Sequence, residues 1–249
     1  MIGVDAFREP LAKHEGKFIL IGGMAAAVQA DEAGLEFRPT KDFDVVLVLE
    51  ALDKSFFDDF WDFVKAAGYS YEKSNGEKQY YRFRKPTAAG YPAQIELFSR
   101  KPDVIELPQG AQLTPIPAGE DASSLSAILL DENYYDCLLR GRIISNGIPV
   151  LGAGLMIPFK AKAYLDLDQR KNEGQLIKQR EIDKHRADVF SLLGMLTADA
   201  QIDIPSSVKG DLARFLEMAG ADAGFDPQPS TGVPKVDAIA RFKALYSLV

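Results

Sequence analysis

The chain has 249 residues, a net charge of −7, a single cysteine and two histidines. One cysteine excludes an internal disulfide and fits a reducing, cytoplasmic setting, and so few histidines argue against zinc, so any metal should have oxygen ligands. No apolar run approaches the ~20 residues of a membrane span, no signal peptide is recognisable, and the negative charge argues against nucleic-acid binding over the whole surface.

The chain begins with a short helix, predicted over residues 4–15, and a buried strand, predicted over 17–21. Gly22 and Gly23 end this strand, and good helix formers follow from Met24 to Ala30. A helix that starts there would direct its first amides and the positive end of its dipole at an anion. The same glycines also fit a tight strand-to-helix turn without any ligand.

Residues 42–49 predict a second strand, which opens with two acids. Because Asp42 and Asp44 are two positions apart, both side chains leave the same face of an extended segment. The residues from Val45 to Leu49 are apolar and mostly β-branched, as in a strand buried on both faces. Two carboxylates at the exposed end of such a strand, beside a Gly-Gly turn, can hold divalent metals against a phosphate chain.

An amphipathic helix is predicted over 52–67, with the apolar residues Phe56, Phe60 and Val64 spaced four apart as a core stripe and Gly68 as its end. Strands are predicted over 69–73 and 79–84 around a turn at 74–76, and over 93–98. Glu96 lies inside the last strand. If it is buried it needs a cation or hydrogen bonds, and the alternative is an edge strand on which it faces water.

Prolines between residues 101 and 120 indicate a domain boundary, which we predict between 1–118 and 119–249. The second part should be mainly helical, with helices over 155–168, 181–196 and 236–248, another capped by Ser206, and loops over 169–180 and 220–234. An Asn-Gly signal predicts a hairpin over 143–150. Residues 160–186 hold eight basic and five acidic residues, a local balance of +3 that suits phosphate contact or a solvated helical face.

Gly22-Gly23 followed by Arg38-x-Thr40-x-Asp42-x-Asp44 resembles the nucleotidyltransferases of the DNA polymerase β superfamily. Within that superfamily the chain is most similar to the AbiEii group, the toxin side of type IV toxin–antitoxin systems, over most of its length. The resemblance implies an α+β fold: a polymerase β-like domain with a mixed sheet flanked by helices, then a mainly helical domain. Many superfamily members have Gly-Ser and a shorter gap before the acids, so Gly23 lacks the hydroxyl found there.

The resemblance also implies roles for residues in both parts of the chain. Two Mg²⁺ or Mn²⁺ ions would be held by Asp42 and Asp44, and Glu96 would share the second ion. The triphosphate would be bound by four residues of the first part: Gly22, Gly23, Arg38 and Thr40. In the second part, lysines on two helices and an acid that positions one of them would face the metal site across a cleft: Lys160 or Lys162, Lys184 and Asp188.

Two features of this second motif limit what it establishes. His185 stands where the AbiEii group often has an acid. The spacing of Lys184 and Asp188 alone also fits a local pair on a helix surface.

The implied activity is metal-dependent transfer of a nucleoside monophosphate from an NTP to an acceptor hydroxyl. A toxin-like enzyme would use an RNA acceptor. The resemblance also implies a separate antitoxin, although type IV antitoxins need not bind the toxin. The alternatives are an aminoglycoside-type enzyme acting on a small molecule and a non-catalytic nucleotide-binding module that acts through a partner. A basic cleft would favour RNA, whereas a closed acidic pocket would favour a cationic small molecule.

Overall fold

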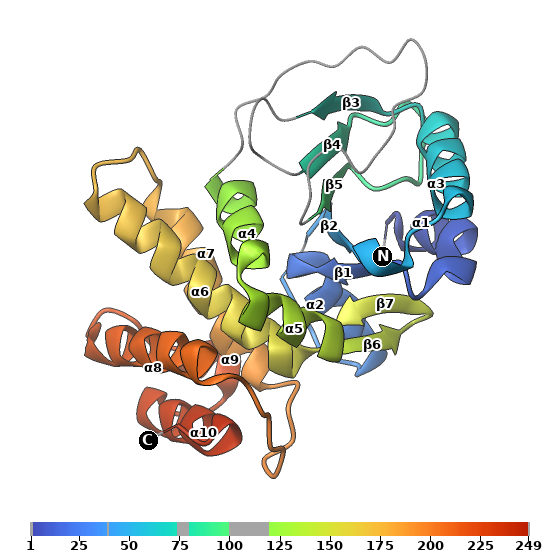
Figure 1. Cartoon of the computed structure of the whole chain (residues 1–249). Coiled ribbons are helices and arrows are strands. Elements are labelled where there is room, and N and C mark those ends of the chain that lie inside the picture. The colour runs from blue at the N-terminus through green and yellow to red at the C-terminus, as the bar shows by residue number, and fades with distance from the viewer. Residues whose placement is uncertain (1, 39, 74–79, 100–119, 249) are drawn as a thin grey trace. The chain divides into compact units, whose positions relative to one another are not determined.

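In the computed structural model, residues 2–38, 40–73, 80–99 and 120–248 are described. The chain divides into two compact units (Figure 1), residues 1–119 with 142–151 and residues 120–141 with 152–249. The hairpin residues 142–151 thus belong with the N-terminal residues, although the predicted boundary placed everything after residue 118 in the second part. The predicted turn at 74–76 and residues 101–119 of the predicted boundary lie outside the described ranges.

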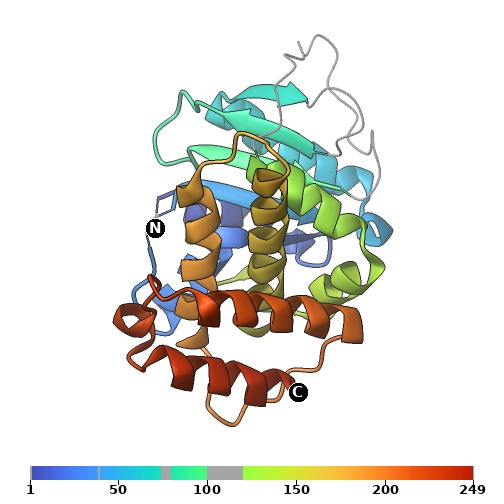
Figure 2. The same cartoon turned by 90° about the vertical axis from the view of Figure 1, so that its left-hand side faces the viewer.

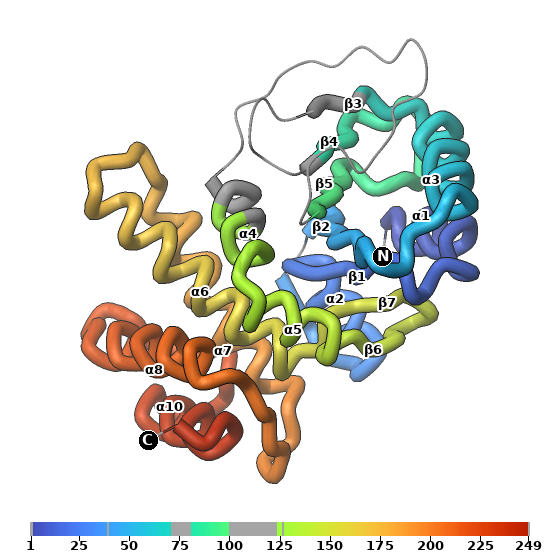
Figure 3. Tube along the Cα trace, viewed as in Figure 1, coloured from blue at the N-terminus to red at the C-terminus, as the bar shows by residue number. Residues whose placement is uncertain are grey.

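In its described residues, the first unit is built on a mixed sheet of seven strands in the order β3-β4-β5-β2-β1-β7-β6, and Figure 3 labels these strands. The strands are β1 Phe18–Ile21, β2 Asp42–Leu47, β3 Ser70–Lys73, β4 Tyr80–Arg84, β5 Gln94–Phe98, β6 Arg142–Ser145 and β7 Ile148–Leu151. Strand β2 lies in the middle, antiparallel to β1 and parallel to β5. The predicted α+β class with a mixed sheet is confirmed.

Aromatic side chains cover one face of this sheet. They come from α1 (Val4–Leu11) and α3 (Lys54–Ala67): the ring of Phe7 contacts Phe43 of β2, and the ring of Phe60 contacts Phe83 of β4. The predicted core stripe on α3 is confirmed, since Phe56, Phe60 and Val64 are each 1% exposed. Because strand side chains alternate, the residues on either side of Phe43 and Phe83 point to the opposite face.

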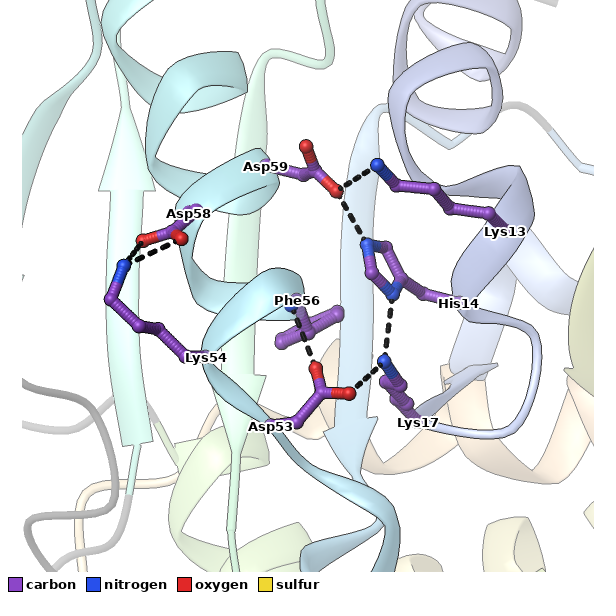
Figure 4. Close-up of polar contacts among 8 residues, drawn as sticks. All are labelled: Lys13, His14, Lys17, Asp53, Lys54, Phe56, Asp58 and Asp59. Atoms are coloured by element: carbon purple, nitrogen blue, oxygen red, sulfur yellow. Dashed lines mark hydrogen bonds and ion pairs between the residues drawn. The ribbon is translucent and has the colours of Figure 1, made fainter.

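A network of charged groups joins the start of the chain to α3 (Figure 4). The helix predicted over 4–15 ends at Leu11 and is followed by the 3₁₀ turn η1 (Ala12–His14). His14 is buried, its Nε2 lies 2.6 Å from Asp59 Oδ2, and Lys13 Nζ lies 2.8 Å from the same oxygen. Lys17 Nζ donates to Asp53 Oδ2 at 2.7 Å and lies 3.1 Å from His14 Nδ1.

The partners fix the chemistry of this network. An ammonium group can only donate, so His14 Nδ1 accepts from Lys17 and Nε2 carries the hydrogen that is donated to Asp59. Hydrogen bonds from Lys13 and then His14 lower the pKa of Asp59. A hydrogen bond from Lys17 lowers the pKa of Asp53, which also caps α3 by accepting from the Phe56 amide at 3.0 Å. The cap explains why α3 begins at Lys54 and not at residue 52.

The predicted hairpin is confirmed, and it completes the sheet of the first unit. Asn146 and Gly147 connect β6 to β7 with φ angles of 48° and 73°, the left-handed pair that a two-residue type I′ turn requires. Strand β7 then pairs in parallel with β1, through Val150 opposite Leu20. This pairing places the hairpin in the first unit.

The second unit is helical in its described residues. Its helices are α4 Glu120–Leu130, α5 Glu132–Arg140, α6 Ala153–Asn172, α7 Gln179–Leu193, α8 Ser206–Ala221, α9 Gln228–Thr231 and α10 Lys235–Tyr246. Helices α6 and α7 lie side by side in both Figure 1 and Figure 2. Its core includes Phe190, whose ring contacts those of Phe215, Phe225 and Phe242. No helix in the described ranges is long and apolar enough to cross a bilayer.

Three local predictions for the second unit were wrong. The loop predicted over 169–180 starts later, because α6 continues to Asn172. Gln169 Nε2 donates to Glu173 Oε1 at 2.8 Å, and this contact between residues four apart supports the last turn of α6. Ser206 is the first residue of α8 and not its cap, since Pro205 occupies the N-cap position. The loop predicted over 220–234 contains the short helix α9.

In the first unit, the short 3₁₀ turn η2 (Leu49–Ala51) follows β2.

Candidate active site

Helix α2 (Gly22–Glu32) starts directly at the end of β1, and Asp44 lies against its first residue. Gly22 has a φ of 70°, and a Cβ added there would lie 2.2 Å from Asp44 Oδ2. Only glycine adopts this backbone easily and lets the carboxylate come so close. The N-cap residue Ile21 is apolar and cannot cap the first amides with its side chain. The Asp44 carboxylate, which lies against Gly22, is at the positive end of the helix dipole.

Two more predicted residues meet at the second glycine of the motif. A Cβ added to Gly23 would lie 3.1 Å from Arg38 Nη2 and 3.2 Å from Thr40 Oγ1. The segment before β2 therefore returns to the start of α2 and brings a guanidinium and a hydroxyl there. Thr40 thus supplies a hydroxyl beside Gly23.

The three predicted carboxylates lie on one face of the sheet, opposite the aromatic face. Strand β2 pairs with β5 so that Asp42 is opposite Gln94 and Asp44 is opposite Glu96. Asp42 is exposed, Asp44 is half-buried, and Glu96 is buried at 6% exposure. The alternative of a water-facing Glu96 on an edge strand is wrong, because β5 lies inside the sheet between β4 and β2.

Glu96 has a partner that sequence reasoning missed. Arg82 of β4 is opposite Glu96, and its Nε donates to Glu96 Oε1 at 2.6 Å. Gln94 Nε2 donates to the same oxygen at 3.1 Å. The sequence signal was the alternation of Arg82, Phe83 and Arg84, which places both arginines on one face of a strand. It did not reveal which strand would be their neighbour.

The directions of the carboxylates decide which residues fit a metal. Asp44 Oδ2 lies against Gly22, at the start of α2, whereas Glu96 Oε1 accepts a hydrogen bond from Arg82 Nε of β4. In the described part of the chain, no group of three or more His, Cys, Asp or Glu side chains is arranged to hold a metal ion. Magnesium binding by Asp42, Asp44 and Glu96 therefore stays a prediction of the resemblance; proteins commonly bind this ion by one or two carboxylates together with substrate phosphates.

Three of the predicted residues of the second unit, Lys160, Lys162 and Asp188, take part in ion pairs. Lys160 Nζ on α6 lies 2.9 Å from Asp188 Oδ2 on α7, and the two side chains are 8% and 1% exposed. Lys162 Nζ lies 2.9 Å from Asp211 Oδ2, an oxygen to which Tyr134 also donates at 3.1 Å. On α7, Lys184 is half-buried next to the buried His185. Phosphate binding by these lysines stays a prediction of the resemblance.

The structure therefore brings together the predicted site residues of the first unit, which are Gly22, Gly23, Arg38, Thr40, Asp42, Asp44 and Glu96. In the second unit it brings Lys160 to Asp188, whereas Lys162 pairs with Asp211. Comparisons with protein-family models, with curated proteins and with solved structures found no match to this chain. Any functional assignment thus depends on the residues and geometry described above.

Proposed function

We propose that the chain is a metal-dependent nucleotidyltransferase that moves a nucleoside monophosphate from an NTP to an acceptor hydroxyl. The observation that carries this proposal is the position of the Asp44 carboxylate against Gly22, where α2 begins. Beside it, Arg38 and Thr40 lie against Gly23. One place thus offers helix amides and a guanidinium to phosphate, and carboxylates to a metal.

In this reaction the acceptor hydroxyl attacks the α-phosphorus in line and pyrophosphate leaves. Charge grows on the attacking, leaving and non-bridging oxygens, so catalysis consists mainly of positioning and electrostatics. Mg²⁺ held by Asp42 and Asp44 would offset phosphate charge and lower the pKa of the acceptor hydroxyl. Glu96, opposite Asp44 in the sheet, is the proposed acceptor of the hydroxyl proton.

The residues around α2 would bind the leaving part of the nucleotide. Without side chains at Gly22 and Gly23, backbone amides can approach the β- and γ-phosphates closely. Arg38 would donate to phosphate oxygens in a fixed fork geometry, and the Thr40 hydroxyl would donate beside it.

The test is label transfer from each α-labelled NTP with Mg²⁺ or Mn²⁺ and total RNA as acceptor. We expect labelled RNA with the wild type and none with the Asp42→Asn/Asp44→Asn double variant. Asp62→Asn is the matched control, because it removes a carboxylate that is 78% exposed on α3, away from the carboxylate pair. Equal labelling by wild type and double variant, or no NTP binding by the wild type, would refute the proposal. Label on a hydroxylated small molecule instead of RNA would identify the aminoglycoside-type alternative.

A further inference from the structure

One imidazole in the first unit lies between a carboxylate and an ammonium group. The His14 side chain is 2% exposed, and its ring packs edge-on against Phe56 of α3, with 5.5 Å between the ring centres. Nε2 lies 2.6 Å from Asp59 Oδ2, and Nδ1 lies 3.1 Å from Lys17 Nζ (Figure 4). Because an ammonium group can only donate, this arrangement requires a neutral imidazole with its hydrogen on Nε2.

The charged groups that face this imidazole balance one another. The ammonium groups of Lys13 and Lys17 come from the turn η1 and the residues after it, and the carboxylates of Asp53 and Asp59 come from the N-cap and the body of α3. Lys13 shares Asp59 Oδ2 with the ring, and Lys17 donates to Asp53 Oδ2 at 2.7 Å. A proton on His14 therefore adds an excess positive charge at a buried position.

The other members of the network keep their charge between pH 5 and pH 8. Hydrogen bonds from Lys13 and then from His14 lower the pKa of Asp59 from 3.8. The pKa of Asp53 is also lowered from 3.8, chiefly by its hydrogen bond from Lys17. Lysine ammonium groups ordinarily keep their proton well above pH 8. The imidazole is thus the group of this network whose charge changes in the range where histidines titrate.

Proton uptake at Nδ1 changes the two polar contacts of the ring in opposite ways. The nitrogen becomes a donor, so it no longer accepts from Lys17, and two positive groups then face each other. The hydrogen bond from Nε2 to Asp59 remains and becomes an ion pair. Lys17 keeps Asp53 as its partner, and its flexible stem lets Nζ move away from the ring.

Lys17 is the link that this change breaks. Its Nζ joins the His14 ring, in the turn η1, to Asp53, the N-cap residue of α3. We propose that His14 forms a pH-sensitive latch: the neutral imidazole accepts from Lys17 and ties η1 to the start of α3, and proton uptake opens this tie while the bond to Asp59 holds. The latch uses none of the residues of the proposed nucleotide site, so its failure would leave the proposed function untouched.

The first test follows the ring nitrogens of the full chain by ¹⁵N nuclear magnetic resonance at pH 8 and pH 5. The chain has two histidines, and contact with the Phe56 ring identifies the signals of His14. At pH 8 the hydrogen should be on Nε2, and Lys17→Met should shift the Nδ1 signal, because this nitrogen loses its donor. At pH 5 both nitrogens should carry hydrogen, and Lys17→Met should leave the Nδ1 signal unchanged, because Lys17 has already moved away.

Thermal unfolding provides a second, independent measurement. Lys17→Met should lower Tm at pH 8, where Nδ1 and Asp53 both lose a donor, and should lower it by less at pH 5, where Nδ1 no longer accepts. Lys54→Met is the matched control: Lys54 pairs with Asp58 on the same helix, and its loss should change Tm equally at both pH values. In a His14→Gln background, which removes the titrating ring, the effect of Lys17→Met should also be equal at both pH values.

Three results would overturn the latch. They are a His14 ring that is still neutral at pH 5, a shift of the Nδ1 signal by Lys17→Met that is the same at both pH values, and a pH-dependent effect of Lys17→Met on Tm that persists in the His14→Gln background. The first of these is read from the wild type alone, so the inference stays falsifiable even if a variant does not fold.

Discussion

Gly22→Ala should damage metal and nucleotide binding far more than it damages the fold. The φ of 70° at this position makes alanine unfavourable by about 1 kcal/mol. The added Cβ would lie 2.2 Å from Asp44 Oδ2, closer than any normal contact, so the carboxylate must move by about 1 Å. A displacement of that size at reacting groups lowers catalysis by about 10²-fold.

Gly34→Ala separates the two effects. Gly34 has nearly the same φ, 68°, but a Cβ there meets nothing within 4 Å. Both variants should lose about 1 kcal/mol of stability, a fall of about 2–4 °C in Tm for a chain of this size. Only Gly22→Ala should also weaken Mn²⁺ and NTP binding and nearly abolish transfer. Wild-type binding in Gly22→Ala, or an equal loss of binding in Gly34→Ala, would refute this reasoning.

Two further predictions concern ion pairs outside the cluster of Asp42, Asp44 and Glu96. The pKa of Asp59 is lowered from 3.8, so its pairs with Lys13 and His14 stabilise the fold above about pH 4 and cease to do so as acidification passes the lowered pKa. Asp59→Asn should therefore lower Tm at neutral pH and have a smaller effect near pH 3; an equal effect at both pH values would contradict the assignment. Asp188→Asn leaves the buried Lys160 charge unpaired and should cost about 3–5 kcal/mol in urea unfolding, whereas Lys160→Met/Asp188→Leu should recover most of it. A double variant no more stable than the single one would be evidence against the pair.

The parts of the site that depend on local patterns could be predicted from the sequence. The common face of Asp42 and Asp44 follows from the period of two in a strand, which needs no knowledge of neighbouring strands. The Gly-Gly turn and the helix after it are likewise local, because β1 ends where α2 begins. The same holds for the Asn146-Gly147 hairpin, whose turn type is set by two residues.

The parts that depend on strand pairing could not be predicted. Whether Glu96 faces water or a cation depends on β4 lying beside β5, in the register that places Arg82 opposite it. No local pattern in either strand encodes that register. The hairpin residues 142–151 join the first unit through the pairing of Val150 with Leu20, across a long stretch of intervening chain. A boundary inferred from prolines near residue 118 could not anticipate this return.

Arg82, Glu96 and Asp44 lie opposite one another on β4, β5 and β2. Each of the two carboxylates has a positive neighbour within the protein: Arg82 beside Glu96, and the start of α2 beside Asp44. The exposed Asp42 is then the carboxylate most accessible to an ion from solution. A triphosphate changes this balance, because it brings Mg²⁺ together with anionic oxygens that can take over the α2 amides and Arg38. Under the proposed function, Asp44 would then turn toward the metal. Metal and nucleotide would therefore bind together, and the substrate would complete the carboxylate cluster.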